Sequence, residues 1–205
     1  MSASLYEIGW QEILGKVGPM LLALAERMTE PPPDYRGVLM TPRGQPYDVR
    51  VIPDIVPWEF CITLWIPGQP RPTEFIREAR FLDLSSMERL IRHEGRHVDR
   101  WHRDGIPGFI LHWADNGGRR DLEAEGFSEN VDWRMMNDGT TPPFAGMDRL
   151  TFWMLTYAAK IDQDYHIRGS GIPAAYRDLA RYVREYFSWE PKSWDSVKEW
   201  KGDFR

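Results

Sequence analysis

Two histidines and a glutamate lie within five residues, in the stretch His-Glu-Gly-Arg-His at positions 93–97. In a helix, residues four apart lie on the same face, so the imidazoles of His93 and His97 would point in the same direction. Two imidazoles at that spacing can bind one tetrahedral zinc ion, and Glu94 between them can act as general base towards a water on the metal. The stretch therefore predicts a zinc site with hydrolytic chemistry.

The residues around this stretch predict the helix that such a site requires. Ser85 and Ser86 are suitable N-cap residues, and apolar side chains then recur at helical intervals as far as Trp101. Gly105 and Pro107 predict the end of the helix, because a glycine followed by a proline commonly stops one. The five-residue motif is therefore expected in the middle of one helix.

The alternative interpretation of this helix is a solvated, charge-rich surface element whose histidines bind nothing. Its basic side chains are Arg92, Arg96, Arg100, His102 and Arg103. Two observations favour the metal site instead. Both histidines of the motif lie on the apolar stripe that contains Leu90 and Trp101, whereas the arginines fall mostly elsewhere on the helical wheel. An acidic segment also follows at a suitable distance along the chain.

A catalytic zinc site takes a third ligand from the protein and leaves the fourth position to water. The candidates lie in the segment DLEAEGFSEN at residues 121–130, which is compatible with a helix and follows a turn at residues 115–118. HEGRHVDRWHRDGIPGF followed by DLEAEGFSEN, about two dozen residues after the second histidine, resembles the gluzincin-type zinc metallopeptidases. It is most similar to short peptidases of bacterial and phage genomes, over roughly residues 85–130.

The resemblance implies that His93 and His97 are zinc ligands and that Glu94 is the catalytic glutamate. It leaves the third ligand open between two placements of the family's acidic pattern. Placing Glu-x-Glu-Ala on the segment makes Glu123 the ligand, with glycine where the family usually has alanine. This placement is favoured, because glutamate reaches further from a helix and fewer departures are needed.

Placing the family's other pattern, Glu-x-x-Ala-Asp, makes Asp121 the ligand. Glu125 then becomes the carboxylate that accepts a hydrogen bond from the ring N–H of a histidine ligand. Asp121 and Glu125 therefore remain alternatives to Glu123. We interpret Glu129 as a solvated surface residue.

The mechanism of this family also needs a donor that stabilises the tetrahedral oxyanion. Tyr165 and His166 are the only adjacent Tyr–His pair downstream of the acidic segment, and they are our candidates for this donor. Tyr157 is a further phenol. The alternative for each is an aromatic side chain packed in a helical core. His102 is weaker, because it lies five residues after the second metal histidine and points away from the metal.

The pattern of the whole chain predicts an α+β fold with a small antiparallel or mixed sheet. Zincin-type domains resemble this plan, and the resemblance implies a zincin-like fold whose sheet packs on the active-site helix. We expect residues 1–30 to form an N-terminal helical segment and residues 31–205 to form a single metallopeptidase domain. Within that domain, the sheet and the HExxH helix occupy residues 31–135, and residues 136–205 are mostly helical. The strand-like runs are 37–41, 47–52 and 58–66, and the clearest later helices are 147–161 and 174–187. The tryptophan-rich tail is either a short docked helix or a binding segment.

The composition of the chain limits the classes of function that it can have. With 42% hydrophobic and 28% charged residues, the chain is typical of soluble globular proteins, and its net charge of −5 gives no electrostatic footprint for nucleic acid. The lone Cys61 excludes an internal disulfide and lies in a strand-like run, so we expect an inert, buried thiol. No signal peptide and no membrane-spanning run is recognisable. We expect a cytoplasmic protein, with association with a virion as the alternative.

The leading functional prediction is a Zn²⁺-dependent peptidase that acts on a peptide or protein substrate; cell-wall peptide crosslinks are one such class. The alternative is a non-catalytic structural or assembly protein, of the phage-virion type, that retains a zincin scaffold and binds a protein partner. A metal-sensing regulator ranks last, because no DNA-binding motif supports it.

Overall fold

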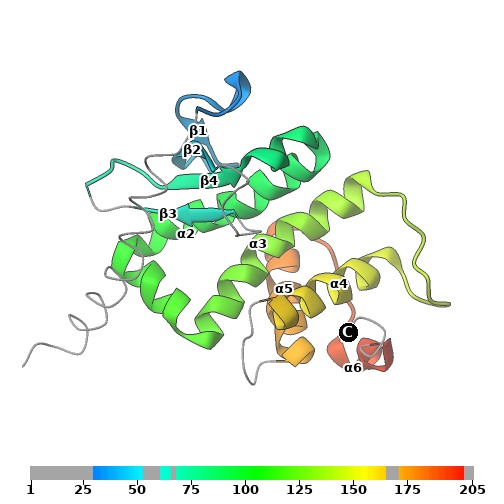
Figure 1. Ribbon diagram of the computed structural model, residues 1–205. Helices are drawn as coiled ribbons and strands as arrows, with labels where there is room; N and C mark the ends of the chain where they lie inside the picture. Colours follow the sequence, from blue (N-terminus) through cyan, green and yellow to red (C-terminus); the bar gives the residue numbers. More distant parts are fainter. Residues whose placement is uncertain (1–29, 53–60, 66–67, 165–170, 201–205) are drawn as a thin grey trace, which may run out of the picture.

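The computed structural model describes residues 30–52, 61–65, 68–164 and 171–200. The N-terminal helical segment predicted over residues 1–30 therefore lies almost entirely outside the described residues. In Figure 1 a small sheet lies beside the long helix α2 at one end of the molecule, and the later helices gather at the other end. The expected α+β class is confirmed. Its helices are α2 (Leu84–Ala114), α3 (Asn116–Asn137), α4 (Arg149–Asp164), α5 (Gly171–Phe187) and α6 (Trp194–Val197), with 3-10 turns η1 (Pro33–Tyr35) and η2 (Glu78–Leu82).

The described strands form one mixed sheet in the order β1-β2-β4-β3. The central pair, β2 and β4, is parallel, while β1 and β3 join the two edges in antiparallel pairing. The strands are β1 (Leu39–Met40), β2 (Pro46–Ile52), β3 (Ile62–Leu64) and β4 (Thr73–Arg77). Strands β1 and β3 fall within the runs expected from the sequence, and β2 begins one residue before its expected run. Strand β4 was not predicted, because four of its five positions are buried and one of them carries Glu74, which removes the usual alternation.

Helix α2 begins at a different cap from the one predicted. The side chain of Asp83 accepts hydrogen bonds from the backbone N–H groups of Ser85 and Ser86, so the serines are the capped residues and not the cap. The predicted stop at Gly105 is a break, since its φ of 67° and ψ of 174° are not helical. The chain then resumes a helix as far as Ala114, because a proline two residues after the break lies in a first turn, where proline is tolerated.

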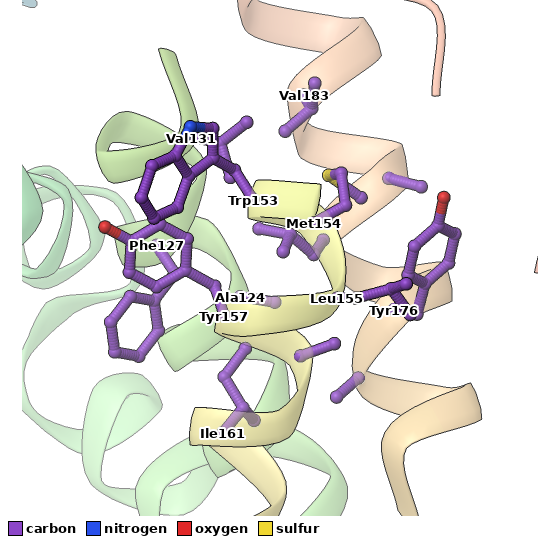
Figure 2. Close-up of a cluster of buried hydrophobic side chains, with 14 of the residues drawn as sticks. Ala124, Phe127, Val131, Trp153, Met154, Leu155, Tyr157, Ile161, Tyr176 and Val183 are labelled. Atoms are coloured by element: carbon purple, nitrogen blue, oxygen red, sulfur yellow. The ribbon is translucent and has the colours of Figure 1, made fainter. Parts of the chain in front are cut away.

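One apolar cluster packs the sheet on α2, and a larger one packs α3, α4 and α5 together. The sheet-side cluster joins β2 and β4 to α2 through Tyr47, Val49, Ile76, Met87 and Val98. The larger, helical cluster is formed by α3, α4 and α5, and Figure 2 shows its side chains meeting between these three helices. The tail is docked on this second cluster, of which the fully buried Val197 of α6 is a member. Three tryptophans of the tail also pack against the cluster: Trp189, Trp194 and Trp200. Within the described residues, no helix is both long and apolar enough to cross a bilayer.

The helical cluster should account for much of the stability of the fold. Replacing Leu179 of α5, which is 0% exposed, with alanine is expected to lower the free energy of unfolding by about 2–5 kcal/mol, because a cavity remains. The matched control is Leu111→Ala on α2, where the leucine is 52% exposed and the change should be within about 0.5 kcal/mol. Chemical denaturation of both variants measures the difference, and equal losses would contradict this account of the core.

Candidate metal centre

Helices α2 and α3 pack against each other in antiparallel directions through a ladder of ion pairs. Arg92 Nη2 lies 2.7 Å from Asp132, and Arg100 Nη1 lies 2.9 Å from Glu125, so residue numbers rise along one helix as they fall along the other. The ladder consists of Arg92, Arg96, Arg100 and Arg103 on α2 and Asp121, Glu125, Glu129 and Asp132 on α3. It fixes how each helix is rotated about its own axis.

The ladder corrects one expectation from the sequence and contradicts one alternative interpretation. Glu129 is not a solvated surface residue, since it is 2% exposed and pairs with Arg92 and Arg96. The arginines do not form a solvated face either, because Arg96 and Arg100 are each 6% exposed. The matching intervals of arginines on one helix and carboxylates on the next are a sequence signal that could have revealed the pairing.

His93 and His97 are buried at 5% and 8% exposure, and their ring centroids are 5.0 Å apart. Both lie on the side of α2 that faces α3, where the edge of the His93 ring packs on Phe127 at 4.5 Å between centroids. The two rings are therefore held by apolar packing, at the helical spacing that the motif predicted.

Glu123 of α3 is the predicted carboxylate that the structure brings to both histidines. Its Oε2 lies 3.4 Å from His93 Nε2, and its Oε1 lies 3.8 Å from His97 Nε2. Two ligands of one tetrahedral zinc, each about 2.0–2.1 Å from the metal, are about 3.3 Å apart. One oxygen of Glu123 lies near this separation from each imidazole, and two imidazoles with one carboxylate are a donor set that catalytic zinc accepts. The described group whose ligand atoms all lie within 4.8 Å of one another contains Glu94 in place of Glu123.

The other two candidates for the third ligand point elsewhere. Glu125 lies two residues from Glu123, about 200° around the helix, and it accepts hydrogen bonds from Arg100 at 2.9 Å and from the Tyr186 hydroxyl at 2.7 Å. Burial acts to raise the pKa of Glu125, but these donors, together with Arg103, lower it. Asp121 accepts from the Tyr182 hydroxyl at 2.9 Å and pairs with Arg100. Neither carboxylate is brought to the imidazoles.

Glu94 lies on the sheet side of the histidines. Its Oε2 accepts a hydrogen bond from the hydroxyl of Thr63 on β3 at 2.7 Å, and its side chain is buried. Potential ligand atoms of His93, Glu94 and His97 all lie within 4.8 Å of one another. The carboxylate is therefore close enough to act on a water held beside the two imidazoles.

Gly126 of α3 is needed for the close approach of the first histidine. A Cβ at this position would lie 2.7 Å from both Cε1 and Nε2 of His93, closer than real Cβ contacts allow. The glycine that departs from the alanine of the family pattern thus makes room for the imidazole.

The buried setting also affects the protonation of His93. Burial lowers the pKa of His93, and the charge of Lys160 adds to this effect while Glu94 opposes it. A neutral imidazole is the form that binds a metal. Among the described residues, neither His93 Nδ1 nor His97 Nδ1 has a hydrogen-bond partner. Glu125 therefore does not accept a hydrogen bond from the ring N–H of either histidine, which was its alternative role.

The remaining candidate residues lie away from the two histidines or outside the described residues. Tyr165 and His166, the predicted oxyanion donors, lie outside the described residues. Tyr157 packs on Phe127 at 5.1 Å in the helical cluster, as its alternative interpretation expects. His102 lies on another face of α2, with its Nε2 3.0 Å from the Pro46 carbonyl.

Two groups of the sheet complete the surroundings of Glu94. The Cys61 thiol is half-buried, where full burial was expected. Burial, followed by the charge of Glu94, raises the pKa of this thiol, which disfavours its reactive thiolate form. Glu74 of β4 is 0% exposed, and neither of its oxygens has a hydrogen-bond partner within the described part of the chain. Burial, followed by the charge of Glu94, raises the pKa of Glu74 well above its usual value, which favours its neutral form. The sequence does not reveal Thr63 and Glu74 as neighbours of the site, because only strand pairing brings them there.

No protein-family profile matches the chain, and neither the curated proteins nor the solved structures contain a significant match to it. The resemblance to gluzincins is therefore carried by the two sequence segments and by the side chains that they place together.

Substituting Gly126 tests the packing of the first histidine. Gly126→Ala is expected to weaken zinc binding by at least about tenfold, because the new methyl group displaces the His93 ring by more than a metal bond tolerates. The matched control is Gly139→Ala, where nothing lies within 4 Å of the added Cβ and the affinity should not change. Competition with a chromophoric chelator measures both, and an unchanged affinity in Gly126→Ala would contradict the site.

Glu74 should make the stability depend on pH. The folded state keeps this carboxyl protonated, while the unfolded chain releases the proton above about pH 4.3. The free energy of unfolding should therefore fall by about 1.4 kcal/mol per pH unit as pH rises, until the raised pKa is reached.

Glu74→Gln removes this dependence, so the gain in stability of the variant over the wild type should be larger at pH 8 than at pH 5. Denaturant unfolding of the metal-free proteins measures it. Exposed Glu88→Gln is the control, with changes within about 0.5 kcal/mol at both pH values. A constant difference between Glu74→Gln and the wild type would rule out a neutral Glu74.

Proposed function

We propose that the protein is a zinc-dependent peptidase that hydrolyses peptide amide bonds, with His93, His97 and Glu123 as the metal ligands. The observation that carries the proposal is the position of the Glu123 carboxylate, 3.4 Å and 3.8 Å from the two Nε2 atoms. These side chains come from two separate helices, and a chance HExxH sequence would not place a third donor at both imidazoles.

The charge of the donor set suits catalysis. Two neutral imidazoles and one carboxylate contribute a single negative charge, so they do not neutralise a divalent cation. Zinc, when bound, lowers the pKa of a water molecule and polarises the carbonyl of the scissile bond. The other carboxylates of α3 are paired with arginines, which offset their negative charge.

Glu94 is the general base in this proposal. Its carboxylate takes a proton from the attacking water and passes it to the leaving nitrogen, which lets the amide bond break without expelling an amide anion. The burial of Glu94 and of both histidines excludes bulk water, and this strengthens the electrostatic effect of each group.

An extended peptide is the substrate that fits the strand arrangement. Strand β3 is at an edge of the described sheet, and its residue Thr63 contacts Glu94. A peptide that adds to this edge through main-chain hydrogen bonds would pass close to the base. No other substrate class is favoured by the described side chains.

Substitutions of the two glutamates separate metal binding from catalysis. Glu94→Gln should retain zinc and lose at least about 100-fold in hydrolysis of a mixed peptide library, because the amide cannot take a proton. Glu123→Gln should lose most of the bound zinc. Metal analysis and mass spectrometry of the library measure the two effects.

Exposed Glu88→Gln serves as the control for the removal of a carboxylate from the same helix as Glu94. Purified wild-type protein that contains no zinc, together with no loss of stability in His97→Ala, would favour the non-catalytic assembly protein instead.

A further inference from the structure

A threonine hydroxyl from the sheet holds the carboxylate of Glu94. Thr63 Oγ1 donates to Glu94 Oε2 at 2.7 Å, and Thr63 is only 6% exposed, so water does not compete for the bond. A hydroxyl carries one hydrogen and can donate to one oxygen. This contact therefore occupies Oε2 and leaves Oε1 for the proton that the base must take.

Thr63 is itself fixed on both sides. Its backbone carbonyl accepts a hydrogen bond from Trp101 Nε1 at 3.3 Å, which joins β3 to α2 one turn after the motif. Trp101 is stacked on Phe109 with ring centroids 3.8 Å apart. On the sheet side, Thr63 is paired with Glu74 of β4. The position of Thr63 is thus set by the fold and does not depend on Glu94.

The hydroxyl of Thr63 donates to Glu94 and not to Glu74, the other carboxyl beside it. Residues paired across antiparallel strands project from the same face, with Cβ atoms about 4.5–5.5 Å apart, so Glu74 offers a second acceptor near Thr63. Neither oxygen of Glu74 has a hydrogen-bond partner among the described residues, whereas Glu94 Oε2 accepts from the Thr63 hydroxyl at 2.7 Å. The single hydrogen of this hydroxyl is thus committed to Glu94.

We propose that Thr63 is the positioning residue for the general base, which its hydroxyl holds by Oε2 so that Oε1 serves the attacking water. The inference rests on the proposed peptidase function, in which Glu94 takes the proton. A carboxylate on a helix otherwise samples several rotamers, and a misplacement of about 1 Å at a reacting group can cost roughly 100-fold in rate.

Two substitutions of Thr63 test the role of its hydroxyl. Thr63→Val keeps the shape and removes the donor, so kcat should fall by about 10- to 100-fold, with KM and zinc content unchanged. Thr63→Ser keeps the donor and should restore kcat to within about threefold of the wild type. Equal activity in the valine and serine variants would overturn the inference.

Thr41→Val provides a matched control. The hydroxyl of Thr41 also donates to a buried carboxylate on α2, that of Asp99 at 2.6 Å, but this bond lies outside the site. Its loss should change stability by a similar amount and leave kcat unchanged. If both valine variants lose activity equally, the effect is a general loosening of α2, and Thr63 has no special role.

The coupling between Thr63 and Glu94 can be measured directly. In the Glu94→Gln background the base is already absent, so adding Thr63→Val should cause no further loss of activity. A second loss of 10-fold or more in the double variant would mean that Thr63 acts by a route other than Glu94, and this would also overturn the inference.

A spectroscopic measurement separates this inference from the proposed function. In metal-free protein, the side-chain ¹³C carboxyl resonance of Glu94 is assigned by its absence in Glu94→Gln. It should shift in Thr63→Val and return in Thr63→Ser. If the shift occurs but the wild type hydrolyses no peptide, the contact is structural, and the proposed function fails together with the positioning role. If hydrolysis depends on Glu94 but neither kcat nor the resonance responds to Thr63→Val, only the positioning role fails.

Discussion

The ion-pair ladder between α2 and α3 is the constraint on which the site depends. Charged pairs that are buried cost several kcal/mol in lost hydration, and they are tolerated only when every charge finds its partner. Arg96, Arg100, Glu125 and Glu129 are all nearly inaccessible to water, so a rotation or a shift of either helix would leave several charges unpaired. An apolar interface could be as stable, but it would accept neighbouring registers more easily. The charges therefore specify one alignment of the helices, and that alignment places the histidines opposite Glu123.

Helical geometry then gives Glu123 and Glu125 of α3 different partners. Residues two apart lie on nearly opposite faces of a helix, so Glu123 cannot face the same way as Glu125. Because arginines and the Tyr186 hydroxyl hold Glu125, the remaining face of α3 turns towards the imidazoles. The same reasoning applies to α2, where His93 faces α3 while the next residue, Glu94, faces β3. One helix thus presents the proposed ligands to one neighbour and the proposed base to another.

Local patterns in the sequence were sufficient for the parts of the site that lie within single helices. The spacing of His93 and His97 predicted their shared face, and the preference for Glu123 among the three carboxylates agrees with its position beside them. The parts that depend on tertiary pairing were missed or misread. Glu129 has the sequence context of a surface residue, and only the facing arginines explain its burial. The contact between Thr63 and Glu94 joins residues 31 positions apart and depends on the pairing of β3 with β4. Strand β4 was not recognised in the sequence, because its buried Glu74 breaks the apolar pattern of a strand.

Two features near His93 and Glu94 favour a functional site at this place, independently of the HExxH motif. A glycine inside a helix costs about 1 kcal/mol relative to alanine, yet Gly126 lies in the middle of α3 directly against the His93 ring. A buried acid without a hydrogen-bond partner is also costly. Glu74 has none among the described residues, yet it lies in the centre of the sheet beside the threonine that holds Glu94. Residues that are unfavourable for local stability are expected mainly where function requires them. Both residues lie beside the proposed ligand and the proposed base, so a surface helix that bears a chance HExxH sequence would have no reason to carry them.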